Sequence, residues 1–248
     1  MTPVPYALRM IWQRLCFLHW AADPAALRPH IPAGLTLDTY KGQAYLGVVP
    51  FVMSGVAPRG LPTVSGLSEF PELNLRTYVT DQHGNAGVWF FSLDATQPIA
   101  VRLARAGFHL PYFGARMWQS ERGDVTEYAS VRTHRGVIGG AFAGAYRPVG
   151  PVFESEPGSL EAFLTERYFL FSAAGGKLYR GQIWHQLWPL QRAEAEIRVN
   201  TLADLIGLKL EGKPHLLYGE RLEVRAGLIT RVPGSGSART GASGRSRS

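Results

Sequence analysis

Residues 72–79, Glu-Leu-Asn-Leu-Arg-Thr-Tyr-Val, alternate between two kinds of side chain. A period of two places successive side chains on opposite faces of an extended strand. One face is largely apolar and carries Leu73, Leu75, Thr77 and Val79. The other carries an acid, an amide, a base and a phenol: Glu72, Asn74, Arg76 and Tyr78. The stretch therefore predicts a β-strand whose polar face is either ordinary solvated sheet surface or the wall of a polar pocket.

Similar patterns recur along the chain and place most of it in strands joined as hairpins. Lys41-Gly42, for example, is typical of a two-residue hairpin turn. Besides 72–79, strands are predicted at 10–20, 35–40, 43–52, 88–93, 115–119, 125–133, 168–172, 177–186 and 216–224, with another ending near Arg147. The strand–helix–strand rhythm of a doubly wound parallel sheet is missing. We therefore expect an α+β fold that is predominantly antiparallel β, with a barrel-like sheet around a central cavity.

Short helices are predicted where a capping residue precedes apolar residues at helical spacing. Asp23 before Pro24 marks one such start, and Ser159 marks another. Helices are expected at 24–30, 97–106 and 160–167 and near 201–206. No linker or internal repeat interrupts this pattern, so residues 1–230 are predicted to form a single domain.

Residues 231–248 differ in composition from the rest of the chain. They are rich in Gly, Ser and Arg and cannot bury apolar surface, so we expect a disordered basic tail. Their four arginines leave only +3 of the net charge of +7 for the other 230 residues. No basic cluster in that body is interleaved with aromatic residues, as binders of single-stranded nucleic acid require. A specific nucleic-acid partner is therefore not expected.

The sequence favours a cytoplasmic protein. No run approaches the ~18–20 apolar residues that span a bilayer, and the N-terminus lacks the pattern of a signal peptide. The single cysteine, Cys16, excludes an intrachain disulfide framework and fits a reducing compartment. A membrane partner is not expected, and the sequence leaves open whether copies of the chain associate.

Motifs of several enzyme classes are absent. The chain has no Walker-type phosphate loop, no Gly-x-Gly-x-x-Gly opening a helix and no Gly-x-Ser-x-Gly elbow. None of the seven histidines forms an i, i+4 pair and no Cys-x-x-Cys occurs, so no local metal motif is present. We expect neither a metal nor a cofactor.

The polar face of residues 72–79 supplies the candidate catalytic residues, Glu72 and Arg76. On a strand they would lie ~13 Å apart, with Asn74 between them. Buried charges need a partner or a shifted pKa. Arg76 could hold a carboxylate with two hydrogen bonds, and Glu72 could serve as a general base or hydrogen-bond acceptor. The alternative is a half-exposed strand with ordinary cross-strand ion pairs.

Aromatic and polar residues elsewhere could complete a pocket, because small-molecule sites combine apolar walls with few polar groups. The ligand-binding candidates are Asn74, Tyr78, Tyr112, Arg116, His19, Trp20, Trp89, Glu166, His185 and Trp188. His185 lies between two tryptophans, where a histidine is more often packed than catalytic, and the same ambiguity holds for His19.

Three groups of residues carry a resemblance to a known family. They are 18–20 with 31–35, then 70–79 with 87–94, and 163–168 with His185 and 188–190. Together they resemble the bacterial family catalogued as domain of unknown function 2071, over residues ~10–225. The name of that family states no activity.

That family is in turn similar to the acetoacetate decarboxylase-like superfamily. The resemblance implies a mostly β, barrel-like fold around a cavity, with an acidic pocket residue that Glu72 matches. It also implies a Schiff-base lysine after a helix and a Gly-x-Pro turn. In the comparable stretch here, 104–113, Tyr112 and Phe113 stand where lysine is expected, and Arg116 is the nearest base. A guanidinium stays protonated and cannot form a Schiff base, which argues against that chemistry.

Two function classes remain open from the sequence. One is an enzyme of lyase or hydrolase type that binds a small anionic or carbonyl-containing molecule through Arg76 and Arg116, with Glu72 and Tyr78 as acid–base or hydrogen-bonding groups. The other is a non-catalytic small-molecule-binding or sensory module. A strongly raised pKa of Glu72 would favour the enzyme. A third class, a structural protein without a cavity, would leave the polar face solvated.

Overall fold

The turn and cap signals of the sequence produce the expected local structure. In the Lys41-Gly42 turn both residues adopt left-handed backbone, with φ of 51° and 84°, as two-residue hairpin turns of type I′ require. Asp23 accepts a hydrogen bond at 2.9 Å from the amide two residues later and so caps the first helix. Ser159 caps the helix that follows it in the same way, at 3.1 Å.

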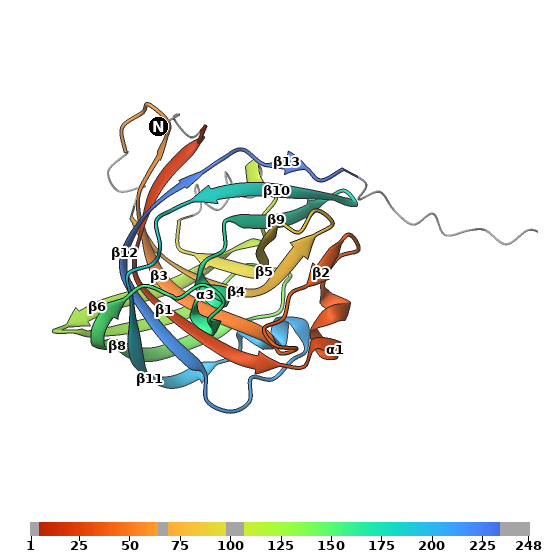
Figure 1. The fold of residues 1–248 in the computed structure, drawn as a ribbon. Helices are drawn as coiled ribbons and strands as arrows, with labels where there is room; N and C mark the ends of the chain where they lie inside the picture. Colours follow the sequence, from red (N-terminus) through yellow and green to blue (C-terminus); the bar gives the residue numbers. More distant parts are fainter. Residues whose placement is uncertain (1–4, 64–68, 98–106, 234–248) are drawn as a thin grey trace, which may run out of the picture.

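The computed structural model describes residues 5–63, 69–97 and 107–233 (Figure 1). The helices are α1 (Pro24–Leu27) and α3 (Leu160–Thr165), with 3₁₀ turns at Arg28–His30 and Leu202–Ile206. The strands are β1 (Leu8–Ala22), β2 (Leu35–Leu37), β3 (Ala44–Pro58), β4 (Phe70–Asp81), β5 (Ala86–Ala95), β6 (Tyr112–Arg122), β7 (Val125–Arg132), β8 (Ala141–Phe153), β9 (Phe169–Ala174), β10 (Lys177–Trp184), β11 (Leu190–Asn200), β12 (His215–Ala226) and β13 (Thr230–Arg231). The predicted α+β fold, dominated by antiparallel strands, is confirmed.

All of these strands belong to one sheet, which forks at two strands and partly closes into a ring. Along one edge β5 pairs with β4, while its other edge pairs with β9 at Val88 and with β6 at Leu93. Likewise β12 pairs with β1 along one edge and, along the other, with β11 at Leu217 and β10 at Ala226. The strands β5, β4, β3, β1 and β12 therefore form a wall shared by two lobes of the sheet.

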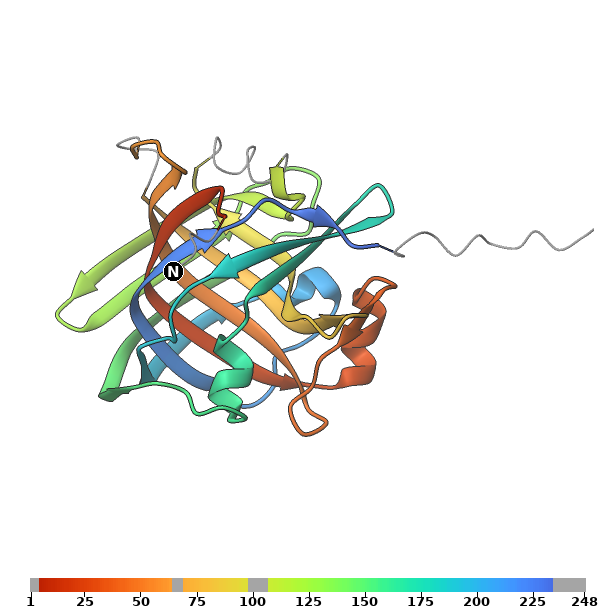
Figure 2. The same ribbon diagram turned by 45° about the horizontal axis from the view of Figure 1, so that its top comes forward.

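This shared wall is buried on both faces, and each face belongs to a separate core. Phe51 and Tyr78 point to one face, where they pack with Leu170 of β9. Leu75 points to the other face and packs with Tyr128 of β7. Figures 1 and 2 show α3 and the β9–β10 hairpin on the same side of β1, β3 and β4. We call the core on this side the cavity-side core and the other the opposite core.

Irregularities in the wall change which residues face each core. In β1 the register with β3 shifts between Gln13 and Leu18, around Arg14, whose φ is 53°. Trp12 before this bulge and Leu15 after it therefore both pack with the cavity-side core, although they are an odd number of residues apart. In β5 a similar shift leaves Phe91 as the extra residue opposite β4.

Some predicted elements differ from the structure. The strand β11 has no counterpart among the predicted elements, and the predicted helix near 201–206 is a 3₁₀ turn. The predicted helix at 97–106 falls almost entirely outside the described residues. The predicted boundary of the tail at 231 lies within β13, and Val232 is buried, whereas 234–248 lie outside the described residues. Among the described residues, no helix is long and apolar enough to cross a bilayer.

Candidate functional site

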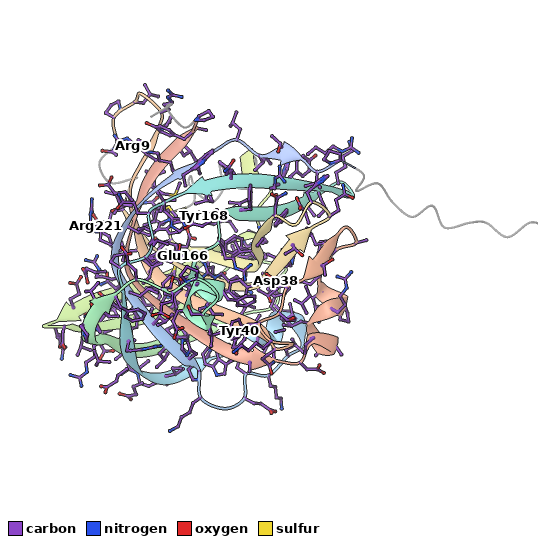
Figure 3. The ribbon with its side chains drawn as sticks, viewed as in Figure 1. Arg9, Asp38, Tyr40, Glu166, Tyr168 and Arg221 are labelled. Atoms are coloured by element: carbon purple, nitrogen blue, oxygen red, sulfur yellow. The ribbon has the colours of Figure 1, made fainter. Side chains whose placement is uncertain are left out.

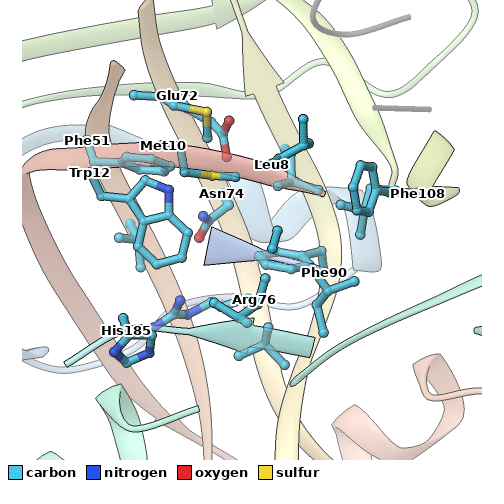
Figure 4. Close-up of a pocket in the computed structure, with 18 of the residues that line it drawn as sticks. Leu8, Met10, Trp12, Phe51, Glu72, Asn74, Arg76, Phe90, Phe108 and His185 are labelled. Atoms are coloured by element: carbon cyan, nitrogen blue, oxygen red, sulfur yellow. The ribbon is translucent and has the colours of Figure 1, made fainter. Parts of the chain in front are cut away.

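A cavity of about 530 Å³ lies on the cavity-side face of the wall (Figure 4). The polar row predicted on 72–79 forms part of its lining, because Glu72, Asn74 and Arg76 all face it from β4. The intervening Leu73 and Leu75 are fully buried in the opposite core. The row is therefore not solvated sheet surface, since a strand buried on both faces has no face left for bulk water.

Glu72 is a buried acid at one end of the row. Its side chain is 2% exposed, and the Tyr112 hydroxyl donates a hydrogen bond to its Oε2 at 3.0 Å. Burial raises the pKa of Glu72 to about 8; the hydrogen bond from Tyr112 lowers it in part, and the charge of Asp94 raises it further. Glu72 is thus mainly a neutral carboxylic acid at pH 7. Because its pKa is close to that pH, it can both give and take a proton.

The strand position of Glu72 is fixed by buried neighbours. The Tyr128 hydroxyl donates to the main-chain carbonyl of Glu72 at 2.7 Å. Asp94 forms an ion pair with Arg132 at 2.8 Å in which neither side chain is exposed. Arg132 also donates to the carbonyl of Ile138 at 3.2 Å. These contacts hold β4, β5 and β7 together behind the acid.

Arg76 is a partly buried cation at the other end of the row. Its Nη2 donates to the carbonyl of Leu164 at 3.3 Å, and its guanidinium lies 5.5 Å from the ring centroid of Phe17. Its Nε is buried without a hydrogen-bond partner. Among the described residues it forms no ion pair. Arg167, which also lines the cavity, is neutralised by Asp38 at 2.6 Å. Arg76 is therefore a cation that can accept an anionic ligand.

Two further polar atoms of the lining lack a partner among the described residues. They are Oδ1 of Asn74 and Nε1 of Trp12, both buried. An unsatisfied buried polar atom costs about 1–3 kcal/mol. Such atoms in a cavity wall mark positions where a bound molecule or water supplies the missing hydrogen bond.

His185 lines the same part of the cavity as Arg76 (Figure 4). Its Nδ1–H donates to the carbonyl of Gln186 at 2.7 Å, which fixes the orientation of the ring. Burial lowers the pKa of His185, only partly opposed by that hydrogen bond and by the charge of Glu166. The Tyr168 ring stacks on His185, with centroids 4.6 Å apart. His185 is thus a neutral, oriented wall residue at pH 7.

Glu166, Tyr78 and His19 are not among the residues that line the cavity. Glu166 accepts from the Tyr168 hydroxyl at 2.6 Å and from the Trp188 amide at 3.2 Å, near α3 (Figure 3). Tyr78 donates to the carbonyl of Leu164 at 2.8 Å, so His19 Nε2 donates to the Tyr78 oxygen at 2.5 Å. Burial, with the charge of Arg76, holds the pKa of His19 well below its usual range. These residues position β4 and α3 against each other.

The remaining candidates divide between the cavity and other places. Tyr112 and Trp188 line it. Trp20 and Trp89, predicted as apolar walls, instead pack with the opposite core, because the bulges of β1 and β5 reverse the alternation. Arg116, predicted as a second anchor, is exposed on β6 and does not line the cavity.

Sequence reasoning missed several lining residues. Trp12 stacks on Trp188 at 6.0 Å and has the orphan Nε1 described above. Phe90 and Phe108 also line the cavity. The bulge near Arg14 is the signal that would have found Trp12. Before it the even-numbered residues of β1 face the cavity-side core, and after it the odd-numbered residues do.

No lysine is available to the cavity. All four lysines of the chain, Lys41, Lys177, Lys209 and Lys213, are described and exposed, and none lines the cavity. The cavity therefore offers no lysine amine for a Schiff base. Within the described ranges no group of three or more His, Cys, Asp or Glu side chains is arranged to hold a metal.

Comparison with known proteins relates most of the chain to one family and one fold. The family model DUF2071, described as an uncharacterised conserved protein, matches residues 9–223. The uncharacterised protein YqjF of Bacillus subtilis is 45% identical over 220 residues, covering 88% of this chain and 90% of its own.

Solved structures share the fold at low sequence identity. The enduracididine biosynthesis enzyme MppR, complexed with pyruvate, has a TM-score of 0.63 at 10% identity and covers 93% of this chain and 91% of its own. The acetoacetate decarboxylase of Legionella pneumophila has a TM-score of 0.61 at 12% identity, covering 92% and 88%. An acetoacetate decarboxylase-like enzyme of Sphingomonas wittichii has a TM-score of 0.61 at 15% identity, covering 92% and 94%. The predicted resemblance to domain of unknown function 2071 is confirmed, and the predicted similarity to acetoacetate decarboxylases is confirmed for the fold.

Proposed function

The chain belongs to the DUF2071 family, and we propose that it binds a small oxo acid in its cavity and catalyses proton transfer beside the carbonyl group, without a Schiff base. The observation that carries this proposal is the pairing, on one buried strand face, of Glu72, an acid that is mainly neutral at pH 7, with Arg76, a cation that has no carboxylate partner among the described residues. The first supplies proton transfer and the second supplies charge recognition.

Each residue of the row has a role that its environment suits. The Arg76 guanidinium holds the ligand carboxylate. The Glu72 carboxylate takes a proton from the carbon next to the carbonyl, and the electron pair moves to the carbonyl oxygen to give an enolate. The Asn74 side chain lies between them on the same face of β4, and its Nδ2 amino group donates to that oxygen. Glu72 then returns the proton. With a pKa of about 8, about one molecule in ten carries the Glu72 carboxylate at pH 7.

The reaction class follows from what the cavity lacks as well as from what it holds. Because every lysine is exposed, electron withdrawal by an imine is not available to this cavity. Proton transfer assisted by hydrogen bonds to the oxygen, as in lyases that work through an enolate, remains. One structural neighbour is complexed with pyruvate and another is an acetoacetate decarboxylase; pyruvate and acetoacetate are both oxo acids, which makes oxo acids the first probes to use.

Hydrogen–deuterium exchange tests the proposal without knowledge of the natural substrate. The protein is incubated in D₂O with a panel of oxo acids, and loss of the proton next to the carbonyl is followed by NMR. We expect exchange above the protein-free rate with wild type. Glu72→Gln should abolish it, and Arg76→Gln should weaken binding. Arg122→Gln, at an exposed position outside the cavity, is the matched control.

A non-catalytic binding module is the second candidate, favoured by the mainly apolar lining of the cavity. Its signature is oxo-acid binding that depends on Arg76 with exchange at the protein-free rate. That result would refute the catalytic proposal while retaining the ligand site.

A further inference from the structure

One part of the cavity lining, away from the polar row, consists of apolar side chains. The side chains come from β1, β3, β5 and the segment before β6: Leu8, Met10, Val56, Val88, Phe90 and Phe108. Leu8, Phe90 and Phe108 gather on the side of the cavity away from Trp12 and His185 (Figure 4). This group contains no charged side chain that could pair with a second charge on a ligand.

The charges of the lining lie elsewhere and allow one anionic group. Arg167 is occupied by Asp38 and lies 4.2 Å from the ring centroid of Phe163. Glu72 is mainly neutral. Arg76 is therefore the lining cation without an ion pair among the described residues. A ligand with one carboxylate and an otherwise apolar body matches this distribution.

The volume of the cavity exceeds what a short oxo acid fills. At about 30 Å³ for each water-sized atom, 530 Å³ holds roughly 18 non-hydrogen atoms. Pyruvate has six. If the rest of the cavity stayed empty, its apolar walls would lose their contacts, and water there would find few polar partners.

Burial gives the ligand a direction. Glu72 is 2% and Asn74 is 5% exposed, whereas Leu228, which also lines the cavity, is 75% exposed. The cavity therefore reaches the surface beside an apolar residue and ends inside at polar ones. A ligand fits with its polar head against β4 and its tail toward Leu228.

We propose that the cavity takes oxo acids with an extended apolar tail of about eight to ten carbons, which together with the five non-hydrogen atoms of the carboxylate and carbonyl stays within the roughly 18 atoms that the volume holds. This inference rests on the proposed function, because it takes the Arg76 end of the cavity as the carboxylate site. It adds the substrate class: a medium-chain acid rather than one of the size of pyruvate.

Calorimetric titration with unbranched carboxylates from butanoate to dodecanoate, below their micelle concentrations, tests it. Burial of each methylene is expected to lower Kd about fourfold. The gain should stop near decanoate, where further carbons pass Leu228 into water. A series in which butanoate binds as tightly as decanoate would overturn the inference.

Two exposed-site variants test the path of the tail. Leu228→Asp places a carboxylate at the mouth and should weaken decanoate binding about tenfold or more while leaving butanoate unchanged. Val152→Asp, 60% exposed on β8 and outside the cavity, should change neither. Equal effects of Leu228→Asp on both acids, or none, would refute the path.

The outcomes separate this inference from the proposed function. Exchange of a short oxo acid together with a flat chain-length series refutes the tail and leaves the function. A steep series that survives Arg76→Gln refutes the carboxylate anchor and leaves an apolar site.

Discussion

Replacement of Glu72 by glutamine should remove a large pH dependence of folding stability. Glutamine has the shape of the neutral acid and keeps an oxygen that accepts from the Tyr112 hydroxyl. The pKa of Glu72 rises from 4.5 to about 8 on folding, mainly through burial. Between these values the folded state holds a proton that the unfolded state has lost. Stability is therefore fully present below pH ~4.5 and falls as the pH rises, by about 1.4 kcal/mol per pH unit.

The loss is complete once the pH exceeds the folded-state pKa, and it then amounts to about 5 kcal/mol. Urea unfolding of wild type and Glu72→Gln at intervals from pH 5 to 8 measures it. The two proteins should have similar free energies of unfolding near pH 5. Toward pH 8 the free energy of unfolding of the variant should exceed that of wild type by a steadily larger amount. Glu223→Gln, whose parent side chain is 80% exposed, controls for the loss of one surface carboxylate.

Parallel stability curves for wild type and Glu72→Gln would refute this reasoning. They would mean that Glu72 titrates alike in the folded and unfolded states. An acid that is already charged at neutral pH in the folded protein could not serve as the near-neutral proton carrier of the proposed reaction.

Three further predictions follow from the same structure. Asp94→Asn leaves the buried Arg132 without its counter-charge and should destabilise the protein by about 3–5 kcal/mol in urea unfolding; a loss below 1 kcal/mol would contradict the pair. Gly87→Ala sets a Cβ against the carbonyl of Phe169 and should cost about 1–3 kcal/mol, whereas Gly139→Ala, which meets nothing, should cost little; equal costs would show that β5 and β9 are not so close. Borohydride reduction with an oxo acid should give no covalent adduct by mass spectrometry, and a lysine adduct would contradict the absence of an amine from the cavity.

The polar row of β4 could be predicted because its alternation is uninterrupted from 72 to 79. Strict period two holds there, and the structure keeps Glu72, Asn74 and Arg76 on one face. The capping signals at Asp23 and Ser159 were equally local, since a cap depends on residues next to it in the chain.

The aromatic walls could not be predicted by the same rule. Trp89 pairs with Thr77, so it shares the face of β4 opposite to the row, and only the register of β4 with β5 reveals this. Trp20 changes face because of the bulge near Arg14. A bulge adds one residue to a strand, so every later side chain lies on the opposite face from the one that strict alternation predicts. The left-handed residue of this bulge is Arg14 rather than a glycine, so the sequence gives no sign of it.

The strand β11 was missed because of its composition. Residues 192–197, Arg-Ala-Glu-Ala-Glu-Ile, consist mostly of residues that favour helices or solvent. Their alternation was present, however, and the burial of β11 follows it, with half-buried residues between exposed ones. Pairing with β8 decides its structure rather than the propensity of its residues.

The most direct test of the charge recognition at Arg76 compares a carboxylate ligand with the uncharged carboxamide of the same shape. Calorimetry would measure the Kd of a medium-chain oxo acid and of the corresponding carboxamide for wild type and for Arg76→Gln. A charged hydrogen bond contributes about 1.5–3 kcal/mol, so wild type should prefer the carboxylate about ten- to hundredfold. Arg76→Gln should bind both alike. Equal binding of acid and amide by wild type, or an unchanged preference in Arg76→Gln, would contradict the account.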